Sequence, residues 1–299
     1  MLKRDDGFGA ELQAHEVLKK LDISSLPVNP FGVADRKDIL CQEKTSLSPG
    51  ISGCLMKVGD AFGILYSSRF AREGFKRFTV AHELGHYFLP GHIEALFGNG
   101  RQCHYSQSGF TSDDKYEREA DSFAAGLLMP KVLFKPVCSK SGQGLDAIQI
   151  LADLCVTSLT ATAIRFAKLS DEPVAIVCSM GDRIQFTFMS KPLQDMRGLT
   201  WIRKNSGIPS GSATATFNKK DDNIRKGKRV SSTTTLDTWF DGGGTAELNE
   251  EVVGLGDYGK TLTVLWADSL PDPEDDEEHE EEEESDEDLL PSQRWRERE

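Results

Sequence analysis

Residues 78–88 read FTVAHELGHYF and contain the pattern His-Glu-x-x-His. On a helix, this spacing places His82 and His86 one turn apart on the same face. Two imidazoles in this arrangement can bind one metal ion, usually zinc, and Glu83 beside them is a candidate base for a water molecule activated by that ion. The pattern therefore predicts a metal centre built on a helix.

The residues around the pattern favour a metal centre over two surface histidines on an ordinary helix. At about 100° per residue, five apolar side chains cluster on the side opposite the histidines. They are Val80, Ala81, Leu84, Tyr87 and Phe88. That side can pack into a core while the histidines face a cleft. Pro90 and Gly91 then end the helix.

A second helix, expected over residues 114–129, supplies a third ligand. Glu117 lies within about 60° of Asp121, beside the apolar side of this helix, whereas Glu119 lies about 160–200° away among exposed positions. A carboxylate on a buried stripe needs a charged partner. We therefore predict that Glu117 is the third ligand and that Asp121 accepts the free N–H of a ligating histidine. Glu119 is predicted to be a surface charge, and a salt-bridged core carboxylate is the alternative for Glu117.

After Pro27 and Pro30, a second short helix is expected around residues 33–40. Residues 50–66 predict two strands joined at Gly59-Asp60, the second leading toward the metal helix. In zinc peptidases a strand in this position commonly borders the cleft and pairs with the substrate backbone. Ile64, Leu65 and Tyr66 are therefore candidate substrate-binding residues. A plain structural hairpin is an equal alternative.

Residues 90–113 are rich in Gly, Ser, Gln and Asn and predict a loop over the site. His92, His104 and Tyr105 lie in this segment. Each is within possible reach of the metal or of a reacting oxyanion, although a loop histidine is more often solvated. We keep His104 and Tyr105 as candidate substrate-binding residues.

Two blocks of the chain resemble the ImmA/IrrE family of zinc metallo-endopeptidases. They are residues 77–86, RFTVAHELGH, and residues 117–130, EREADSFAAGLLMP. The N-terminal helix with LPVNP at 26–30, Gly53 and the strand at 64–66 are also similar. The resemblance implies a gluzincin-like core with zinc on His82, His86 and Glu117 and with Glu83 as base. Family members often have Asn in place of Asp121, and either residue can orient a histidine.

The resemblance also implies a function inside the cell. Members of the family typically cut or inactivate a helix-turn-helix repressor and so free stress-response or mobile-element genes. Two alternatives remain: a non-catalytic regulator that binds and sequesters a repressor, and a DNA-binding regulator that acts through residues 145–169. Manganese and iron also remain alternatives to zinc.

Residues 145–169 predict two short helices, over 146–154 and 160–169, with Ser158 as the N-cap of the second. The pair resembles a helix-turn-helix. On the second helix only Arg165 and Lys168 could contact DNA phosphates. A DNA-binding site usually has more cations than this. We therefore expect a role in packing or partner docking and no direct DNA binding.

The remainder predicts a small β-rich domain. Residues 173–189 indicate a hairpin with its turn at Gly181-Asp182. Further short β-like pieces are expected around Trp201, Ala213, Trp239 and residues 262–266. Six basic residues within 219–229 predict a solvated turn, with recruitment of an acidic partner or nucleic acid as the alternative.

Charge and composition limit the remaining possibilities. Of the formal net charge of −13, fourteen negative charges fall within residues 272–288, and the rest of the chain carries +1. This run cannot bury apolar surface, so we expect it to be disordered. Six cysteines without a Cys-x-x-Cys pair favour free thiols in a reducing compartment. With no signal peptide or membrane-spanning run, we expect a cytoplasmic protein.

The predicted fold class is α+β. A zincin-like core with its metal helix and a small edge sheet is followed by helix-turn-helix-like helices and a β-rich region. The expected segments are a metallopeptidase core at 1–140, a helix-turn-helix-like segment at 141–170, a β-rich C-terminal domain at 171–270 and a disordered acidic tail at 271–299.

Overall fold

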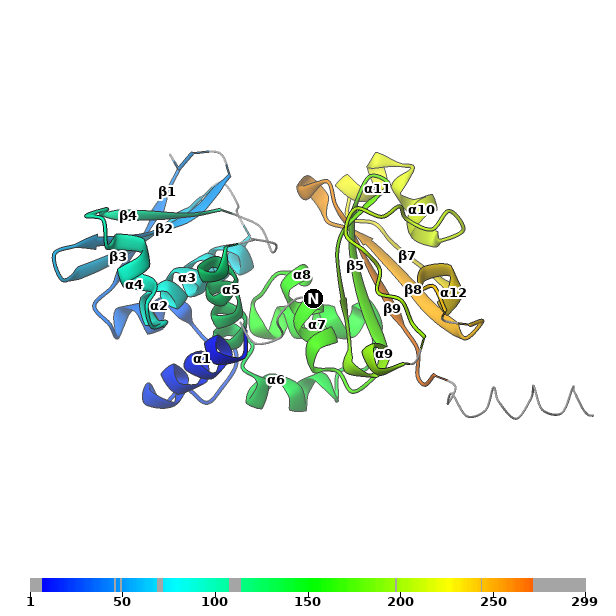
Figure 1. Cartoon of the computed structure of the whole chain (residues 1–299), viewed down its shortest axis with the longest axis horizontal. Coiled ribbons are helices and arrows are strands. Elements are labelled where there is room, and N and C mark those ends of the chain that lie inside the picture. Colours follow the sequence, from blue (N-terminus) through cyan, green and yellow to red (C-terminus); the bar gives the residue numbers. More distant parts are fainter. Residues whose placement is uncertain are drawn as a thin grey trace, which may run out of the picture.

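The computed structural model describes residues 7–45, 47–48, 50–68, 72–107, 114–196, 198–242 and 244–270. The acidic tail predicted at 271–299 lies outside these ranges. Two sheets lie at opposite ends of the molecule, with helices α6, α7 and α8 between them (Figure 1). The predicted α+β class is confirmed.

The N-terminal half combines a four-stranded sheet with packed helices. Its helices are α1 (Phe8–Lys20), α2 (Pro30–Asp35), α3 (Glu73–Phe88), α4 (His92–Phe97) and α5 (Lys115–Leu128). The sheet has the order β1-β3-β2-β4, formed by β1 (Leu40–Lys44), β2 (Ile51–Val58), β3 (Ala61–Ser67) and β4 (Cys103–Gln107). The hairpin at Gly59-Asp60 is confirmed, because β2 and β3 pair antiparallel on either side of it.

Two local predictions in this half are wrong. The helix expected around 33–40 lies earlier, because the Asn29 side chain accepts a hydrogen bond from Phe31 N and Pro30 occupies the first helical turn. Residues 40–44 then form β1, parallel to β3. The loop expected over 90–113 contains α4 and β4. The backbone of β4 pairs with β2 and so satisfies that strand's outer hydrogen-bonding groups.

Three helices connect the two halves: α6 (Lys131–Cys138), α7 (Gly144–Cys155) and α8 (Leu159–Leu169). The last two confirm the predicted pair, and the Ser158 side chain accepts a hydrogen bond from Ala161 N at 3.1 Å. Arg165 is buried, with Nη1 2.8 Å from Glu11 Oε1 and Nε donating to the Met129 carbonyl. Arg165, one of the two cations that the sequence places for phosphate, is therefore occupied by contacts inside the protein.

The C-terminal sheet is antiparallel throughout and has the order β6-β5-β9-β8-β7. Its strands are β5 (Val174–Met180), β6 (Arg183–Met189), β7 (Arg229–Thr235), β8 (Glu247–Gly254) and β9 (Thr261–Trp266). Short helices accompany it: α9 (Lys191–Asp195), α10 (Ala213–Asn218), α11 (Asp221–Arg225), α12 (Leu236–Trp239) and the 3₁₀ turn η1 (Gly256–Tyr258). The predicted hairpin at 173–189 and the strand at 262–266 are confirmed.

The β-like pieces expected around Ala213, Trp239 and Trp201 are wrong. Ala213 begins α10, whose N-terminus is capped by the Ser212 hydroxyl. Trp239 ends α12, where it packs with Leu236 into a small cluster on the sheet. Trp201 lies in no regular element. At Ala213 a local cap, and at Trp239 a local apolar pair, outweighs the weak β propensity.

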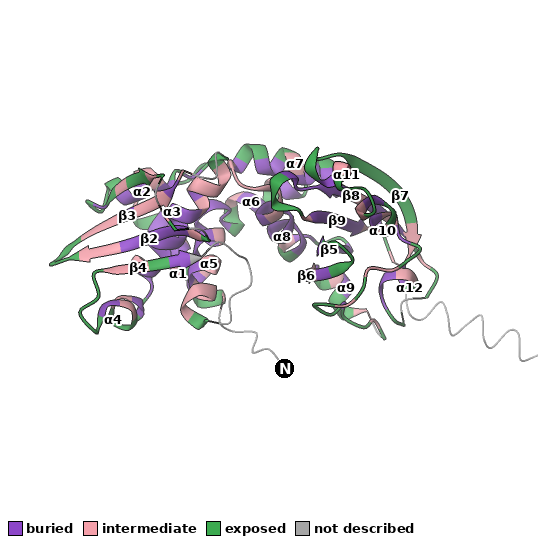
Figure 2. Cartoon of the chain, turned by 90° about the horizontal axis from the view of Figure 1, so that it is seen from above, coloured by how far each residue is buried: buried purple, intermediate pink, exposed green. Residues whose placement is uncertain are grey.

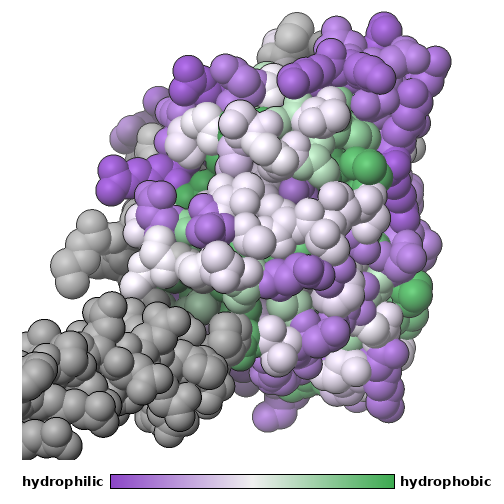
Figure 3. All heavy atoms as spheres, turned by 90° about the vertical axis from the view of Figure 1, so that its right-hand side faces the viewer, coloured by the Kyte–Doolittle hydropathy of each residue, from purple (hydrophilic) through white to green (hydrophobic). Residues whose placement is uncertain are grey.

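The basic stretch at 219–229 includes α11 and the start of β7. Asp222 neutralises part of it by pairing with Lys226 at 2.6 Å. The edge strand β7 that follows is mostly exposed and rich in Ser and Thr. On the face shown in Figure 3, polar and near-neutral residues predominate and apolar ones are scattered. A polar edge of this kind discourages pairing with other chains.

One hydrophobic cluster extends through both halves, from Ala10 in α1 to Val264 in β9. It includes residues of α3, α5, α7, α8 and β5, and buried segments are found on both sides of the connecting helices (Figure 2). The division at 140 and 170 stays a prediction. In the described part of the chain no single helix is long and apolar enough to cross a membrane; α7 and α8 pass that test only as a pair bent by 111°.

Candidate metal centre

The centre is built where α3 crosses α5 at Gly85. A Cβ atom on Gly85 would lie 3.0 Å from the Ala120 Cα atom and 3.2 Å from the Ala120 carbonyl oxygen. Only a glycine allows the two helices to approach this closely. The close crossing brings Glu117, one turn earlier on α5, beside the histidines of α3.

Three ligand atoms converge at this crossing. The Nε2 atoms of His82 and His86 are 3.1 Å apart. Glu117 places Oε2 3.3 Å from the first nitrogen and Oε1 3.4 Å from the second. Two ligands at 2.0–2.1 Å from a tetrahedral zinc ion are about 3.3 Å apart. The predicted ligands are thus brought together at separations that fit zinc, and both histidines are buried.

Asp121 lies where the sequence predicts. Its Oδ1 atom is 2.8 Å from His82 Nδ1. The carboxylate accepts the Nδ1–H, which leaves the Nε2 lone pair of His82 directed toward the other ligands. Burial lowers the pKa of His82, but the hydrogen bonds to Asp121 and Glu117 raise this pKa well above its ordinary value. A proton therefore competes with a metal ion for the Nε2 atom of His82.

A second chain of contacts stands behind His86. Its Nδ1 atom is 3.0 Å from Nδ1 of His92, and His92 Nε2 is 3.1 Å from Glu119 Oε2. Burial lowers the pKa of His92 and lowers that of His86 to about 3, so both rings are neutral. With Glu119 accepting the Nε2–H of His92, the remaining nitrogen of His92 accepts the Nδ1–H of His86.

This arrangement corrects the prediction that Glu119 is a surface charge. Its side chain is 19% exposed, and it fixes the tautomer of His92. The left-handed backbone at Gly91, with φ of +79°, turns the chain so that α4 folds back and buries His92 behind α3. The Pro90-Gly91 pair marked the end of α3 but did not indicate the direction of the turn.

His104 and Tyr105 are neighbours on β4 and therefore point to opposite faces of the sheet. His104 faces the centre, with Nε2 2.9 Å from Glu117 Oε1. Burial raises the pKa of Glu117, but hydrogen bonds from His104, His82 and His86 hold it well below its ordinary value. Tyr105 is half exposed on the other face, beside Cys103. The candidacy of Tyr105 as a site residue is therefore wrong.

The prediction that Ile64, Leu65 and Tyr66 pair with substrate is also wrong. Their strand, β3, is paired on one side with β1 and on the other with β2. Both rows of backbone hydrogen-bonding groups are thus occupied, and no extended peptide can be added. The strand signal was correct, but no signal in the sequence indicated that residues 40–44 would pair with this strand as β1.

Glu83 is fully buried, and neither of its carboxyl oxygens has a hydrogen-bond partner among the described residues. A Cβ atom on Gly53 of β2 would lie 2.7 Å from Glu83 Oε1, so only glycine leaves room for this carboxyl. Burial raises the pKa of Glu83 to about 7, against the opposing effects of His82 and of the nearby Ser106 hydroxyl. A buried carboxyl without a partner is costly unless a ligand supplies one.

Residues 57–163 match the family model of peptidase M78, described as the IrrE N-terminal-like domain. The matched range includes all three ligand residues and Glu83. No curated protein matches the chain. Among solved structures, a Mycobacterium tuberculosis transcriptional regulator is similar over 88% of this chain and 76% of its own, with a TM-score of 0.55 and 14% sequence identity. At this identity the similarity shows the fold alone.

Proposed function

Because residues 57–163 match the model of the IrrE N-terminal-like domain of peptidase M78, we propose that the protein is a zinc-dependent endopeptidase acting on a protein substrate. One observation carries the proposal. Nitrogen and oxygen atoms of His82, His86 and Glu117 lie at the mutual separations of zinc ligands, beside the buried, unpartnered carboxyl of Glu83.

Zinc held by these three residues would supply a Lewis acid that polarises a peptide carbonyl and makes a nearby water more acidic. Glu83 accepts a proton from the attacking water, whose oxygen bonds to the carbonyl carbon. Glu83 then passes this proton to the amide nitrogen as the C–N bond breaks, so that an amine and a carboxylic acid form; the acid gives its remaining proton to the amine or to solvent as the products leave. In the metal-free protein, burial raises the pKa of Glu83 to about 7, so this carboxylate is a stronger base than an exposed one.

Four side chains support the ligands in this proposal without touching substrate. Asp121 orients His82, and the pair His92–Glu119 orients His86. His104 donates to Glu117 Oε1, and this contact occupies its Nε2–H. His104 is therefore a positioning residue for Glu117. A role in stabilising an oxyanion would require this hydrogen bond to break.

The substrate backbone pairs with β4 in this proposal. Within the described ranges β4 pairs with β2 alone and is an edge strand of its sheet. It carries His104, so its exposed edge runs beside the ligands. An extended peptide added to such an edge places a carbonyl near the centre by main-chain hydrogen bonds.

The favoured substrate is a helix-turn-helix repressor, whose cleavage would relieve repression of stress-response or mobile-element genes. This choice rests on the family resemblance. The rival is a regulator that binds and sequesters the repressor without cutting it, a role compatible with the same fold. The buried, unpartnered Glu83 favours the peptidase, because sequestration requires no such carboxyl.

The test is incubation of the zinc-loaded protein with a helix-turn-helix repressor encoded beside it. We expect two repressor fragments by mass spectrometry, none with Glu83→Gln, and zinc retained in that variant. Removal of zinc by a chelator should stop cleavage and its return should restore it. Cleavage that persists in Glu83→Gln contradicts the role of this residue. An intact, stable complex with the wild-type protein identifies the sequestering regulator.

A further inference from the structure

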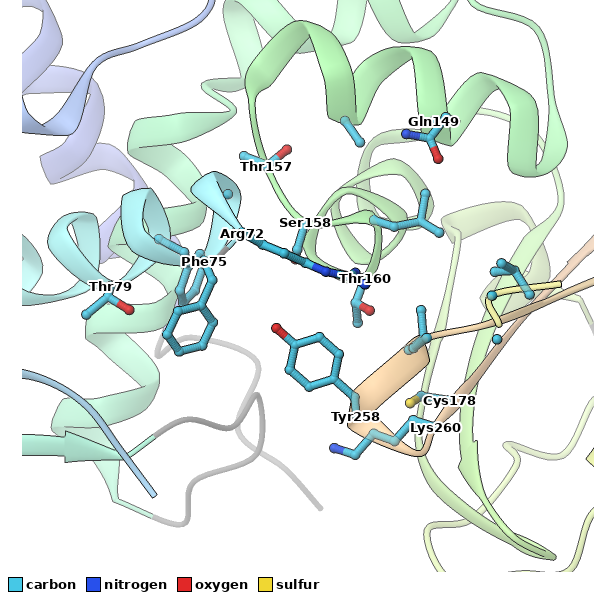
Figure 4. Close-up of a pocket in the computed structure, with 18 of the residues that line it drawn as sticks. Arg72, Phe75, Thr79, Gln149, Thr157, Ser158, Thr160, Cys178, Tyr258 and Lys260 are labelled. Atoms are coloured by element: carbon cyan, nitrogen blue, oxygen red, sulfur yellow. The ribbon is translucent and has the colours of Figure 1, made fainter. Parts of the chain in front are cut away.

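A cavity of about 540 Å³ lies between the metal helix and the C-terminal sheet. The beginnings of α3 and α8 line one side, and β5, β6, η1 and Lys260 line the other (Figure 4). One end reaches His82 and Asp121. This volume is typical of small-molecule sites and exceeds the space that one substrate side chain needs.

The charges that line the cavity are mainly positive. Arg72, Arg229 and Lys260 contribute cations, whereas Asp121, the one carboxylate among the described lining residues, already binds His82. Arg229 pairs with Asp146 at 3.1 Å. Within the described ranges, Arg72 and Lys260 form no ion pair with a carboxylate. Arg72 instead lies over the Tyr258 ring, 5.7 Å from its centroid.

The start of α8 adds to this positive potential. Thr157, Ser158, Leu159 and Thr160 all line the cavity, and α8 is an eleven-residue helix. The first N–H groups of a helix have no partner within it and favour an anion. The start of α3 adjoins this point, since a Cβ atom on Gly74 would lie 2.8 Å from Ser158 N.

Apolar side chains form much of the remaining lining, beside the polar Ser52, Thr79 and Gln149. Aromatic and aliphatic side chains come from both halves: Phe75, Phe78, Phe186, Val253, Leu255 and Tyr258. The side chains of Arg72, Thr160, Tyr258 and Lys260 gather around one space (Figure 4). A ligand that satisfies such a lining needs a negative group for the cations and an apolar body for the walls.

We propose that the cavity binds an organic anion, with a phosphate, sulfonate or carboxylate joined to an aromatic or aliphatic group. Its negative group lies between Arg72, Lys260 and the start of α8, and its apolar part lies against the aromatic side chains. Because both halves contribute, the bound anion connects the C-terminal sheet to the metal helix. The occupant is an effector, distinct from the peptide that is cut.

The test uses 8-anilinonaphthalene-1-sulfonate, an aromatic sulfonate whose fluorescence rises in apolar surroundings. We expect saturable binding of one probe per chain to the full-length protein, at least tenfold weaker in Arg72→Gln/Lys260→Met. The control Arg183→Gln/Lys131→Met removes two exposed cations outside this cavity and should bind like wild type. The uncharged analogue N-phenyl-1-naphthylamine should bind wild type at least tenfold more weakly than the sulfonate.

A further variant tests the location. Thr160→Trp fills the cavity without changing charge and should abolish saturable binding, with folding checked by thermal unfolding. If Thr160→Trp fails to fold, the comparison of Arg72→Gln/Lys260→Met with its control decides whether the probe binds in this cavity. Equal binding by the cation variant and its control overturns the proposal, as does equal binding of the uncharged analogue.

The same probe separates effector from substrate. Binding is measured in Glu83→Gln and after chelation, so its result does not depend on peptidase activity. We expect no change in probe affinity on adding the protein substrate. Stoichiometric displacement of the probe by that substrate would overturn the effector assignment and identify the cavity as a substrate subsite.

Discussion

The Nδ1 atom of His86 lies 3.0 Å from the Nδ1 atom of His92. One nitrogen must donate to the other, and Glu119 on the far side of His92 decides which. The state in which His86 donates leaves its Nε2 lone pair for a metal. A buried histidine outside the ligand set thus controls whether a ligand is in the correct tautomer.

Replacing His92 by Phe should weaken zinc binding by about 10- to 100-fold, because His86 loses the acceptor that fixes its tautomer. Glu119→Gln should have a smaller effect in the same direction. Competition with a chromophoric chelator measures both affinities. Glu94→Gln, an exposed change on α4, is the control. Zinc affinity in His92→Phe equal to that of the control would refute the role of the pair.

Asp121 permits a graded comparison. Asp121→Asn retains an acceptor for the Nδ1–H of His82, so zinc affinity should stay within a few fold of wild type. Asp121→Ala removes the acceptor and should lower affinity by about 10- to 100-fold. The same competition assay applies. A large loss in the Asn variant would show that negative charge, and not orientation, is what His82 requires.

Gly53→Ala should separate catalysis from metal binding. The new Cβ would lie 2.5 Å from Thr79 Cγ2 and 2.7 Å from Glu83 Oε1, so the carboxyl must move. A misplaced general base typically loses about 10²–10⁴-fold in rate, whereas the three ligands stay in place. Gly63→Ala on β3 is the matched control, since its Cβ would meet nothing closer than 3.6 Å. Cleavage rate and zinc affinity are measured for both, and a parallel loss of the two would count against this explanation.

The metal-free protein should lose stability as pH rises through the titration of Glu83. The folded pKa of about 7 exceeds the ordinary value of 4.5, so the unfolded chain ionises first. Unfolding then releases a proton between these values, and stability falls with rising pH before levelling above about 7. At 1.36 kcal/mol per pKa unit the loss is about 3 kcal/mol.

Glu83→Gln removes this titration. Its free energy of unfolding, relative to wild type, should rise by about 3 kcal/mol between pH 4.5 and pH 8 in urea titrations with a chelator present. Glu94→Gln should show no such rise. A difference between Glu83→Gln and wild type that does not change with pH would mean that Glu83 titrates normally.

The sequence predicted the parts of this centre whose signals lie within one element. Spacing on α3 indicated His82 and His86, and the stripe on α5 indicated Glu117 and Asp121. The environment of Glu119 depends on His92, 27 residues away and brought near by a turn whose direction has no local signal. A helical wheel describes one helix, so it misassigned a carboxylate whose partner lies on another.

The order of strands in the N-terminal sheet was the other feature that the sequence did not predict. The two strand-like runs on either side of Gly59-Asp60, within residues 50–66, were sufficient to predict a hairpin. It could not show that β1 adds to β3 in parallel or that β4 becomes the edge beside the metal ligands, because these are contacts between distant segments. The strand proposed to pair with substrate is therefore β4 (Cys103–Gln107) and not the segment Ile64–Tyr66.

The hydrophobic cluster that extends from α1 to β9 makes the chain cooperative. The family match ends at residue 163, inside α8, and α8 packs on β5 and β6. A fragment that ended at that point would lack Phe166 and Ala167. The apolar residues of the cluster that pack against them would then be exposed. The smallest unit that folds on its own should therefore extend beyond the matched range, and the two halves should melt in a single calorimetric transition.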